Sequence, residues 1–372
     1  LSYALINSNQ TEAALEVYRE LIIADPNSAM ARAGIGKSLL LAGKPYEAMK
    51  HLKRATILEP GNKEYQALLR KAKNELAITL SYQFMYINEQ EPIDLGIDTA
   101  AYNIHALLNI VGLSKRVSDR LSLRFSHLLD RSEREYYMQE TENRWYDNTS
   151  LRATLLLNKH RINLFAGGSF TEEQLTSYGL AWDYGRTIKK VRFSNTLSAG
   201  YDYYYYWNQV GHDYISEHMR LGIGKFSFDA HYRYVNVREL YLIDLDTLGR
   251  NPGHQYTLTA KYTFLKNPKI TLGVYHNYRD YEHKSSRYWS PQDRRLNAGT
   301  ATIYWESPKG VYAWISGNAG RASDGIDHWE ASGELGYNRK TTSYSIGAAR
   351  FYNPWYENFI AYLSVTKRFA KL

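Results

Sequence analysis

The chain has 372 residues, of which 44% are apolar and 23% are charged, and its formal net charge is +8. It contains no run of about 18 uncharged apolar residues, which excludes a helical membrane protein but leaves a β-barrel open, because alternating strands average to a polar value. The chain has no cysteine, which excludes disulfides, thiolate metal sites and a cysteine nucleophile.

The distribution of basic residues argues against a nucleic-acid partner, and the aromatic content favours a membrane interface. Lys and Arg are scattered without long basic blocks, and no helix-turn-helix, zinc-finger or aromatic RNA-binding signature occurs, so we expect no nucleic-acid partner. Tyrosine is abundant, with 34 residues against 11 Phe and 8 Trp. Because a tyrosine side chain is apolar along its ring and polar at its tip, it favours membrane–water interfaces.

Residues 1–76 have the composition and spacing of packed helices. Pro26 and Pro60 lie 34 residues apart, as do Ala14 and Ala48. Small residues let two helices approach closely, and each proline ends the second helix of a pair. This pattern resembles the tetratricopeptide repeat (TPR), with residues 63–77 as one more helix; a generic helical bundle is the alternative. The chain starts inside a repeat, so we expect it to be the C-terminal part of a longer precursor with more repeats upstream.

In residues 77–372 the pattern changes: apolar side chains occupy every second position of each segment. We call the odd-numbered and even-numbered positions of a segment its two parities, and the apolar residues share one parity. Many segments exceed the about 5–6 residues of soluble strands and suit the about 9–11 residues that cross a bilayer at a tilt. The sequence therefore predicts an outer-membrane antiparallel β-barrel of about 16 strands. We place the strands at 76–87, 100–114, 120–132, 145–157, 161–169, 175–186, 191–205, 213–223, 226–237, 255–264, 270–280, 294–306, 311–320, 327–338, 342–352 and 357–369.

The connections and the tail also favour a membrane barrel over a soluble sandwich. Short, often basic turns, such as 188–190 and 224–225, alternate with longer loops, such as 238–252. Short periplasmic turns and longer external loops are typical of outer-membrane barrels. The last strand ends near Phe369, which resembles the terminal aromatic of bacterial outer-membrane proteins, although Ala-Lys-Leu follows it. An even strand count brings both ends, and the helices, to the periplasmic side.

If the apolar parity faces lipid, the other parity lines the barrel. In the second segment we take Ile104, Ala106 and Leu108 as the lipid face and His105 as inward. A wall rich in arginine with some carboxylates must be wetted, and it predicts a hydrated conduit for a polar polymer. Alternatively, Arg–carboxylate pairs on neighbouring strands simply tie the wall together. The predicted polymer-lining residues are Arg124, Arg152, Arg192, Asp202, Arg220, Asp229, Arg233, Arg279, Tyr312, Trp314, Glu330 and Glu334.

Two clusters lie outside this inward set. The run 201–207 (YDYYYYW) is interpreted as an aromatic girdle at the outer interface, with a sugar-binding lip as the alternative. The basic short turns would ring the periplasmic mouth, where they contact either anionic lipid or an acidic periplasmic partner. The residues predicted for that partner contact are Lys189, Lys190, Lys266 and Lys340.

Catalytic and metal-binding signatures are missing from the sequence. There is no Gly-x-Ser-x-Gly elbow, no His-Glu-x-x-His and no phosphate-binding loop. We therefore expect neither an enzyme nor a cofactor.

Helical repeats that run into a barrel of about 16 strands resemble the bacterial exopolysaccharide exporters for cellulose, poly-N-acetylglucosamine and Pel. The segment 288–292 (YWSPQ) is similar to an aromatic-Ser-Pro segment of that group. The resemblance implies an outer-membrane channel that passes a biofilm polysaccharide to the cell surface, with the repeats as a periplasmic scaffold. The basic turns lean towards a Pel-like exporter with a periplasmic lipoprotein partner.

Two other classes compete with the exporter. Surface-lipoprotein assembly modulators also join such repeats to a barrel, with about 14 strands, so a lower strand count would favour them. A general nutrient porin is the third candidate, although a diffusion pore needs no attached helices.

Overall fold

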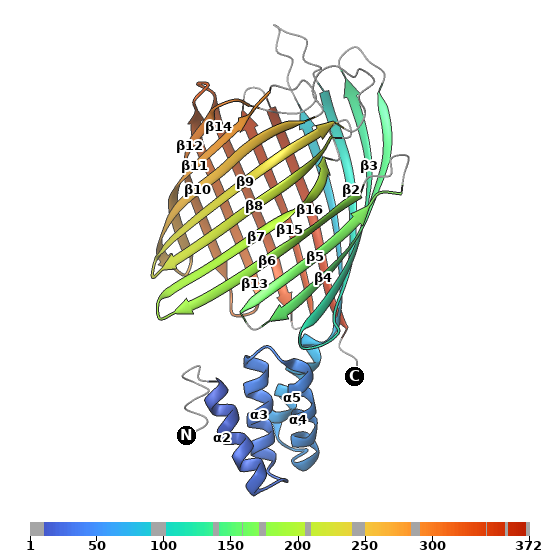
Figure 1. Ribbon diagram of the computed structural model, residues 1–372, viewed down its shortest axis with the longest axis vertical. Helices are drawn as coiled ribbons and strands as arrows, with labels where there is room; N and C mark the ends of the chain where they lie inside the picture. The colour runs from blue at the N-terminus through green and yellow to red at the C-terminus, as the bar shows by residue number, and fades with distance from the viewer. Residues whose placement is uncertain are drawn as a thin grey trace.

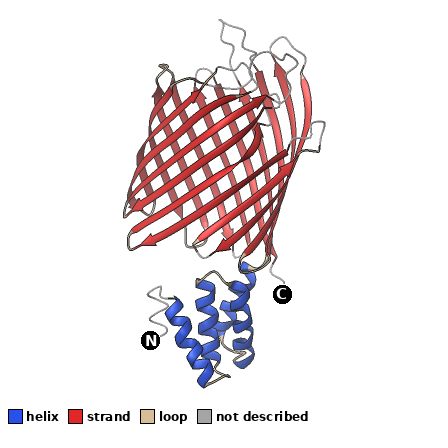
Figure 2. Ribbon diagram, in the orientation of Figure 1, coloured by secondary structure: helices blue, strands red, loops and turns tan. Residues whose placement is uncertain are grey.

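The computed structural model describes residues 11–90, 102–136, 141–157, 159–170, 176–204, 210–239, 250–283, 291–339, 341–353 and 356–369. Within these ranges the chain forms four helices followed by a closed barrel of sixteen antiparallel strands (Figure 1). The helices form a separate layer below one end of the barrel (Figure 2), which we call the helix-proximal end. The predicted fold, repeat helices followed by a barrel of about 16 strands, is confirmed.

Small residues bring the helices together, as the repeat pattern predicted. The helices are α2 (Thr11–Ala24), α3 (Ala29–Leu41), α4 (Pro45–Leu58) and α5 (Lys63–Glu75). Gly34 and Gly36 of α3 face Tyr18 and Leu52, and a Cβ at either glycine would lie within 2.4 Å of that side chain. Ser28 and Asn62 accept hydrogen bonds from the first turns of α3 and α5, as N-cap residues do. No described helix is long and apolar enough to span a membrane.

Each strand of the barrel pairs with its sequence neighbours, and β1 closes the ring against β16 from Ile78↔Phe369 to Gln90↔Glu357. The strands are β1 (Ile78–Gln90), β2 (Tyr102–Arg116), β3 (Leu121–Tyr136), β4 (Glu142–Leu157), β5 (His160–Gly168), β6 (Thr176–Ile188), β7 (Val191–Tyr204), β8 (Val210–Ile223), β9 (Phe226–Glu239), β10 (Asn251–Lys266), β11 (Lys269–Tyr281), β12 (Arg294–Glu306), β13 (Val311–Ala322), β14 (Asp327–Arg339), β15 (Thr342–Asn353) and β16 (Tyr356–Phe369).

Short connections gather at the helix-proximal end. Lys189 and Lys190 join β6 to β7, and Gly224 and Lys225 join β8 to β9. Gly224 has a φ of +60°, a conformation that favours glycine in a two-residue hairpin turn. The predicted short turns are therefore confirmed.

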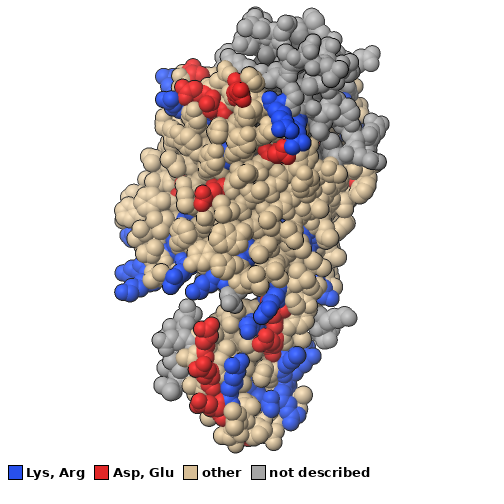
Figure 3. Space-filling model, viewed as in Figure 1, with Lys and Arg blue, Asp and Glu red and all other residues tan. Residues whose placement is uncertain are grey.

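The outer wall is apolar between two charged ends. In the view of Figure 3, Lys, Arg, Asp and Glu gather towards the two ends of the barrel, and most of the wall between them is uncharged. Large apolar side chains such as Leu151, Leu164 and Leu335 are more than half exposed on this wall. Such a band is what a barrel needs where it meets hydrocarbon.

A carboxylate of the barrel caps a helix of the repeats. Lys44 precedes α4 and supplies no side-chain cap. Instead Asp119, in the turn between β2 and β3, accepts hydrogen bonds from the backbone N–H groups of Tyr46 (2.7 Å) and Glu47 (3.0 Å). The Tyr46 hydroxyl donates to the Arg116 carbonyl at 3.0 Å, and the Arg116 guanidinium donates to the Gly43 carbonyl. The turn thereby fixes the helices to the barrel.

Replacing Asp119 with Ala should loosen this junction. We expect a loss of about 1 kcal/mol in the local stability of α4, because the first N–H groups of the helix lose their cap. Hydrogen exchange at Tyr46 and Glu47 should accelerate, Asp119→Asn should have a smaller effect, and Asp25→Ala, away from the barrel, should leave both amides unchanged. Unaltered exchange at these two amides in Asp119→Ala would contradict the capping role.

Candidate functional site: the inner face of the barrel

Strand pairing sorts the side chains into two faces, because alternate residues of a strand point to opposite sides of the sheet. One face exposes large apolar side chains, among them Ile315, which is 66% exposed. On the other face, Arg152 of β4 and Tyr214 of β8 interact electrostatically, although β5, β6 and β7 lie between them in the wall. The register places both on one row with Phe165, Gly179 and Gly200, and the Phe165 and Tyr214 rings lean over the two glycines, so the side chains converge along this face as they do on the concave side of a curved sheet. The second face is therefore the inner face.

The register places every residue of the predicted polymer-lining set on the inner face. Arg124 lies opposite Arg152, Arg220 opposite Asp229, and Trp314 opposite Glu334. The same parity continues through the other strand pairs, so the remaining members share this face: Arg192, Asp202, Arg233, Arg279, Tyr312 and Glu330.

The prediction for β2 is wrong. His105 points outward, where its ring stacks on outward Tyr86 at a centroid distance of 6.4 Å. Ile104, Ala106 and Leu108 point inward instead and are buried in one apolar cluster with Ile87. The alternation misleads here because β2 is apolar on both parities, and its outward face is formed by Leu107, Val111 and Leu113.

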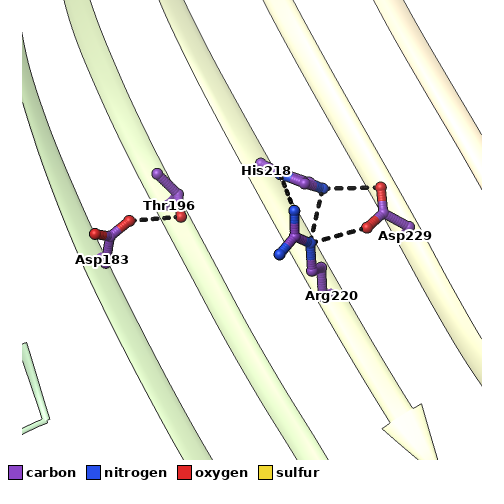
Figure 4. Close-up of polar contacts among 5 residues, drawn as sticks. All are labelled: Asp183, Thr196, His218, Arg220 and Asp229. Carbon is purple, nitrogen blue, oxygen red and sulfur yellow. Dashed lines mark hydrogen bonds and ion pairs between the residues drawn. The ribbon is translucent and has the colours of Figure 1, made fainter. Parts of the chain in front are cut away.

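Two polar clusters lie on the inner face, one across β5, β6 and β7 and one across β8 and β9, and Figure 4 shows part of each. Asp183 accepts hydrogen bonds from Thr196 (2.7 Å) and Asn163 (2.8 Å). Asp229 lies 2.8 Å from His218 Nε2 and accepts from Arg220 Nε at 3.1 Å. These two carboxylates are thus bonded by side chains of neighbouring strands, as the wall-tying alternative describes.

A third polar cluster surrounds Glu334 on β14. Tyr312 of β13 and Tyr362 of β16 donate to its two carboxylate oxygens, each at 2.5 Å. The Tyr362 ring reaches over β15 because Gly347 lies there, and a Cβ at Gly347 would be 2.4 Å from that ring. The nearby Glu330 accepts from the Asn318 amide at 3.0 Å. Hydrogen bonds to a carboxylate are among the stronger ones, so this cluster stiffens the wall.

The inner face changes along the barrel axis. Near the helix-proximal end, inward Arg124, Arg152 and Arg192 are exposed to solvent. Towards the far end, inward side chains are buried, such as Val235 (0%) and Val237 (2%) of β9. The inner face is therefore more exposed at these arginines than at these far-end positions.

Sequence reasoning missed several inner-face residues. His218, Asn163 and Tyr362 complete the three clusters, and their parity would have identified them if the alternation had been extended to these polar positions. Val235 and Val237 join Tyr281 in a buried inward cluster. Apolar residues at inward positions gave no signal, because the apolar parity was read as lipid-facing.

The remaining predicted positions divide between described and undescribed residues. Lys189, Lys190 and Lys266 are exposed at the helix-proximal end. Lys340 lies outside the described residues, as do 205–207 of the aromatic run and 288–290 of the aromatic-Ser-Pro segment. Of that segment, the Pro291 carbonyl accepts from the Tyr281 amide at 3.1 Å. Across the described ranges, His, Asp and Glu form no cluster that could hold a metal ion.

Cysteine labelling tests the two faces, since the chain has no native cysteine. In membranes that contain the protein, Arg124→Cys should react with a water-soluble maleimide at least about tenfold faster than Phe125→Cys, its neighbour on the apolar face, because thiol labelling needs water. Equal rates, or faster labelling at position 125, would contradict the assignment of the inner face.

Comparisons with known proteins agree with both parts of the fold. A tetratricopeptide-repeat family model matches residues 5–72. No curated protein matches the sequence. Among solved structures, the chain is similar to one titled "Bacterial polysaccharide outer membrane secretin", with a TM-score of 0.58, 10% identity and coverage of 79% of this chain and 99% of that chain.

Two other solved structures match more weakly. OccAB3 of Acinetobacter baumannii has a TM-score of 0.41 and 8% identity, over 79% of this chain and 99% of that chain. OpdK of Pseudomonas aeruginosa, solved with vanillate, has a TM-score of 0.41 and 9% identity, over 78% and 98%. The chain therefore has helices that match a tetratricopeptide-repeat model, followed by a closed barrel similar in fold to a solved outer-membrane protein.

Proposed function

We propose that the chain is an outer-membrane channel that exports an exopolysaccharide of the biofilm matrix to the cell surface. The observation that carries the proposal is the polar inner face, whose arginines are exposed near the helix-proximal end, in a barrel whose β2–β3 turn is bonded to the helices. A barrel of sixteen strands has room for an aqueous passage. The polymer passes without chemical change, and no cofactor takes part.

The helices, in this proposal, lie in the periplasm and receive the polymer or its partner proteins. Asp119 and Arg116 fix the helices next to the helix-proximal opening of the barrel. A polysaccharide released by the repeats is therefore already close to that opening. The exposed Lys189, Lys190 and Lys266 surround that opening and offer a basic surface to a periplasmic or lipoprotein partner or to the headgroups of outer-membrane lipid. The similar solved structure, which is described as a polysaccharide outer membrane secretin, supports the choice of cargo.

The competing classes fit less well. The sixteen strands exceed the about 14 expected for surface-lipoprotein assembly modulators. A nutrient porin gives no role to helices that are bonded to the barrel turn.

Deletion of the gene tests the proposal. The monosaccharide composition of extracellular material should lose one polymer on deletion and regain it when the intact gene is restored. A variant with the helices but without the strands serves as a control and should not restore export. An extracellular sugar profile unchanged by deletion would contradict the proposal and point to surface lipoprotein display.

A further inference from the structure

On the inner face, carboxylates and arginines that are intermixed in the sequence differ in their partners. The inward carboxylates of β6 and β9 are already bonded within the wall, Asp183 by Asn163 and Thr196, and Asp229 by His218 and Arg220. Three inward arginines near the helix-proximal end have no such partner: Arg124, Arg152 and Arg192 form no ion pair with any described carboxylate. All three are exposed to the water of the lumen.

Two of these arginines face each other. Arg124 on β3 and Arg152 on β4 are directly opposed in the register. Like charges opposed on neighbouring strands destabilise a sheet, so this pair does not hold the wall together. Their inward position also separates them from lipid, which could neutralise only the outward lysines and arginines. The counter-charge must therefore come from the lumen.

The surroundings of the guanidinium groups leave them open to a ligand. Arg152 lies over the Phe165 ring at 5.8 Å, which orients its plane. Gly112 and Gly222 lie beside Arg124 and Arg192, and a Cβ at either glycine would come within 3.6 Å of the guanidinium. A guanidinium held over a flat surface presents its N–H donors sideways, in the arrangement that binds acidic oxygens in pairs.

From this geometry we propose, resting on the proposed export function, that the exported polymer is an acidic polysaccharide, and that Arg124, Arg152 and Arg192 form its entry site on the inner face of β3, β4 and β7. Basic turns beside this entry, including Lys189, Lys190 and Lys225, add positive charge at the same end and draw the polymer in. Among the described residues, the inward carboxylates near this end are Asp183, Asp229 and Glu334, which side chains of the wall already bind, and the exposed Glu306, which lies on β12, away from these strands.

Binding of sugar oligomers to the purified full chain tests the entry site. The probes are fluorescently labelled oligomers of equal length: galacturonate (acidic), cellulose fragments (neutral) and glucosamine (cationic). The galacturonate oligomer should bind, and its affinity should fall as salt rises. Arg124→Gln with Arg152→Gln should weaken it about tenfold, because the oligomer loses two charge contacts near solvent.

The chain offers a matched control for the third arginine. Arg192 points inward at the start of β7, whereas Arg186 points outward at the same end of β6, opposite Phe193. Arg192→Gln should weaken binding of the galacturonate oligomer, and Arg186→Gln, with the same change in net charge, should not. Equal weakening in both variants would show a general charge effect and overturn the entry site.

Every other outcome also decides the proposal. If the neutral or the cationic oligomer binds as tightly as galacturonate, or if the double variant binds galacturonate normally, the acidic cargo is wrong. The export function stands in that case provided that gene deletion still removes a polymer from the cell surface. If no oligomer binds and deletion leaves the surface sugars unchanged, both the entry site and the export function fail.

Discussion

Closure of the barrel by β1 and β16 is the constraint on which the rest of the structure depends. Their pairing, from Ile78↔Phe369 to Gln90↔Glu357, gives every strand two partners and leaves no open edge. In a bilayer, where unpaired backbone groups are costly, only a closed sheet of strands is stable. Once the sheet is closed, the parity of a residue decides whether its side chain meets hydrocarbon or the lumen.

Parity is also the reason why so much of the fold could be predicted. Strands such as β9, with Phe226 and Phe228 outward and Asp229 inward, alternate cleanly, and their faces follow from the sequence. The method fails where both parities are apolar, as in β2, and where the lumen is packed, as at Val235. It also cannot find Asp119 as the cap of α4, because that contact joins residues 73 positions apart.

Which inward side chains pair with each other depends on the register between neighbouring strands, and the composition of the chain does not reveal that register. The sequence shows arginines and carboxylates in mixture, and it allows either an internal ion-pair lattice or a charged passage. The structure contains both: Asp183, Asp229 and Glu334 are bonded within the wall, whereas Arg124 and Arg152 face the lumen without a carboxylate partner among the described residues. The bonded carboxylates stiffen the barrel, and the arginines leave positive charge facing the lumen.

The most direct measurement places the polymer inside the barrel of secreting cells. A photo-crosslinking amino acid is introduced at Trp314, which points inward on β13, and separately at Ile315, which points outward and is 66% exposed. After illumination, the passage of polymer through the lumen predicts sugar attached to the barrel at position 314 and none at position 315. Sugar at neither position in cells that still secrete the polymer, or at 315 alone, would contradict transport through the barrel.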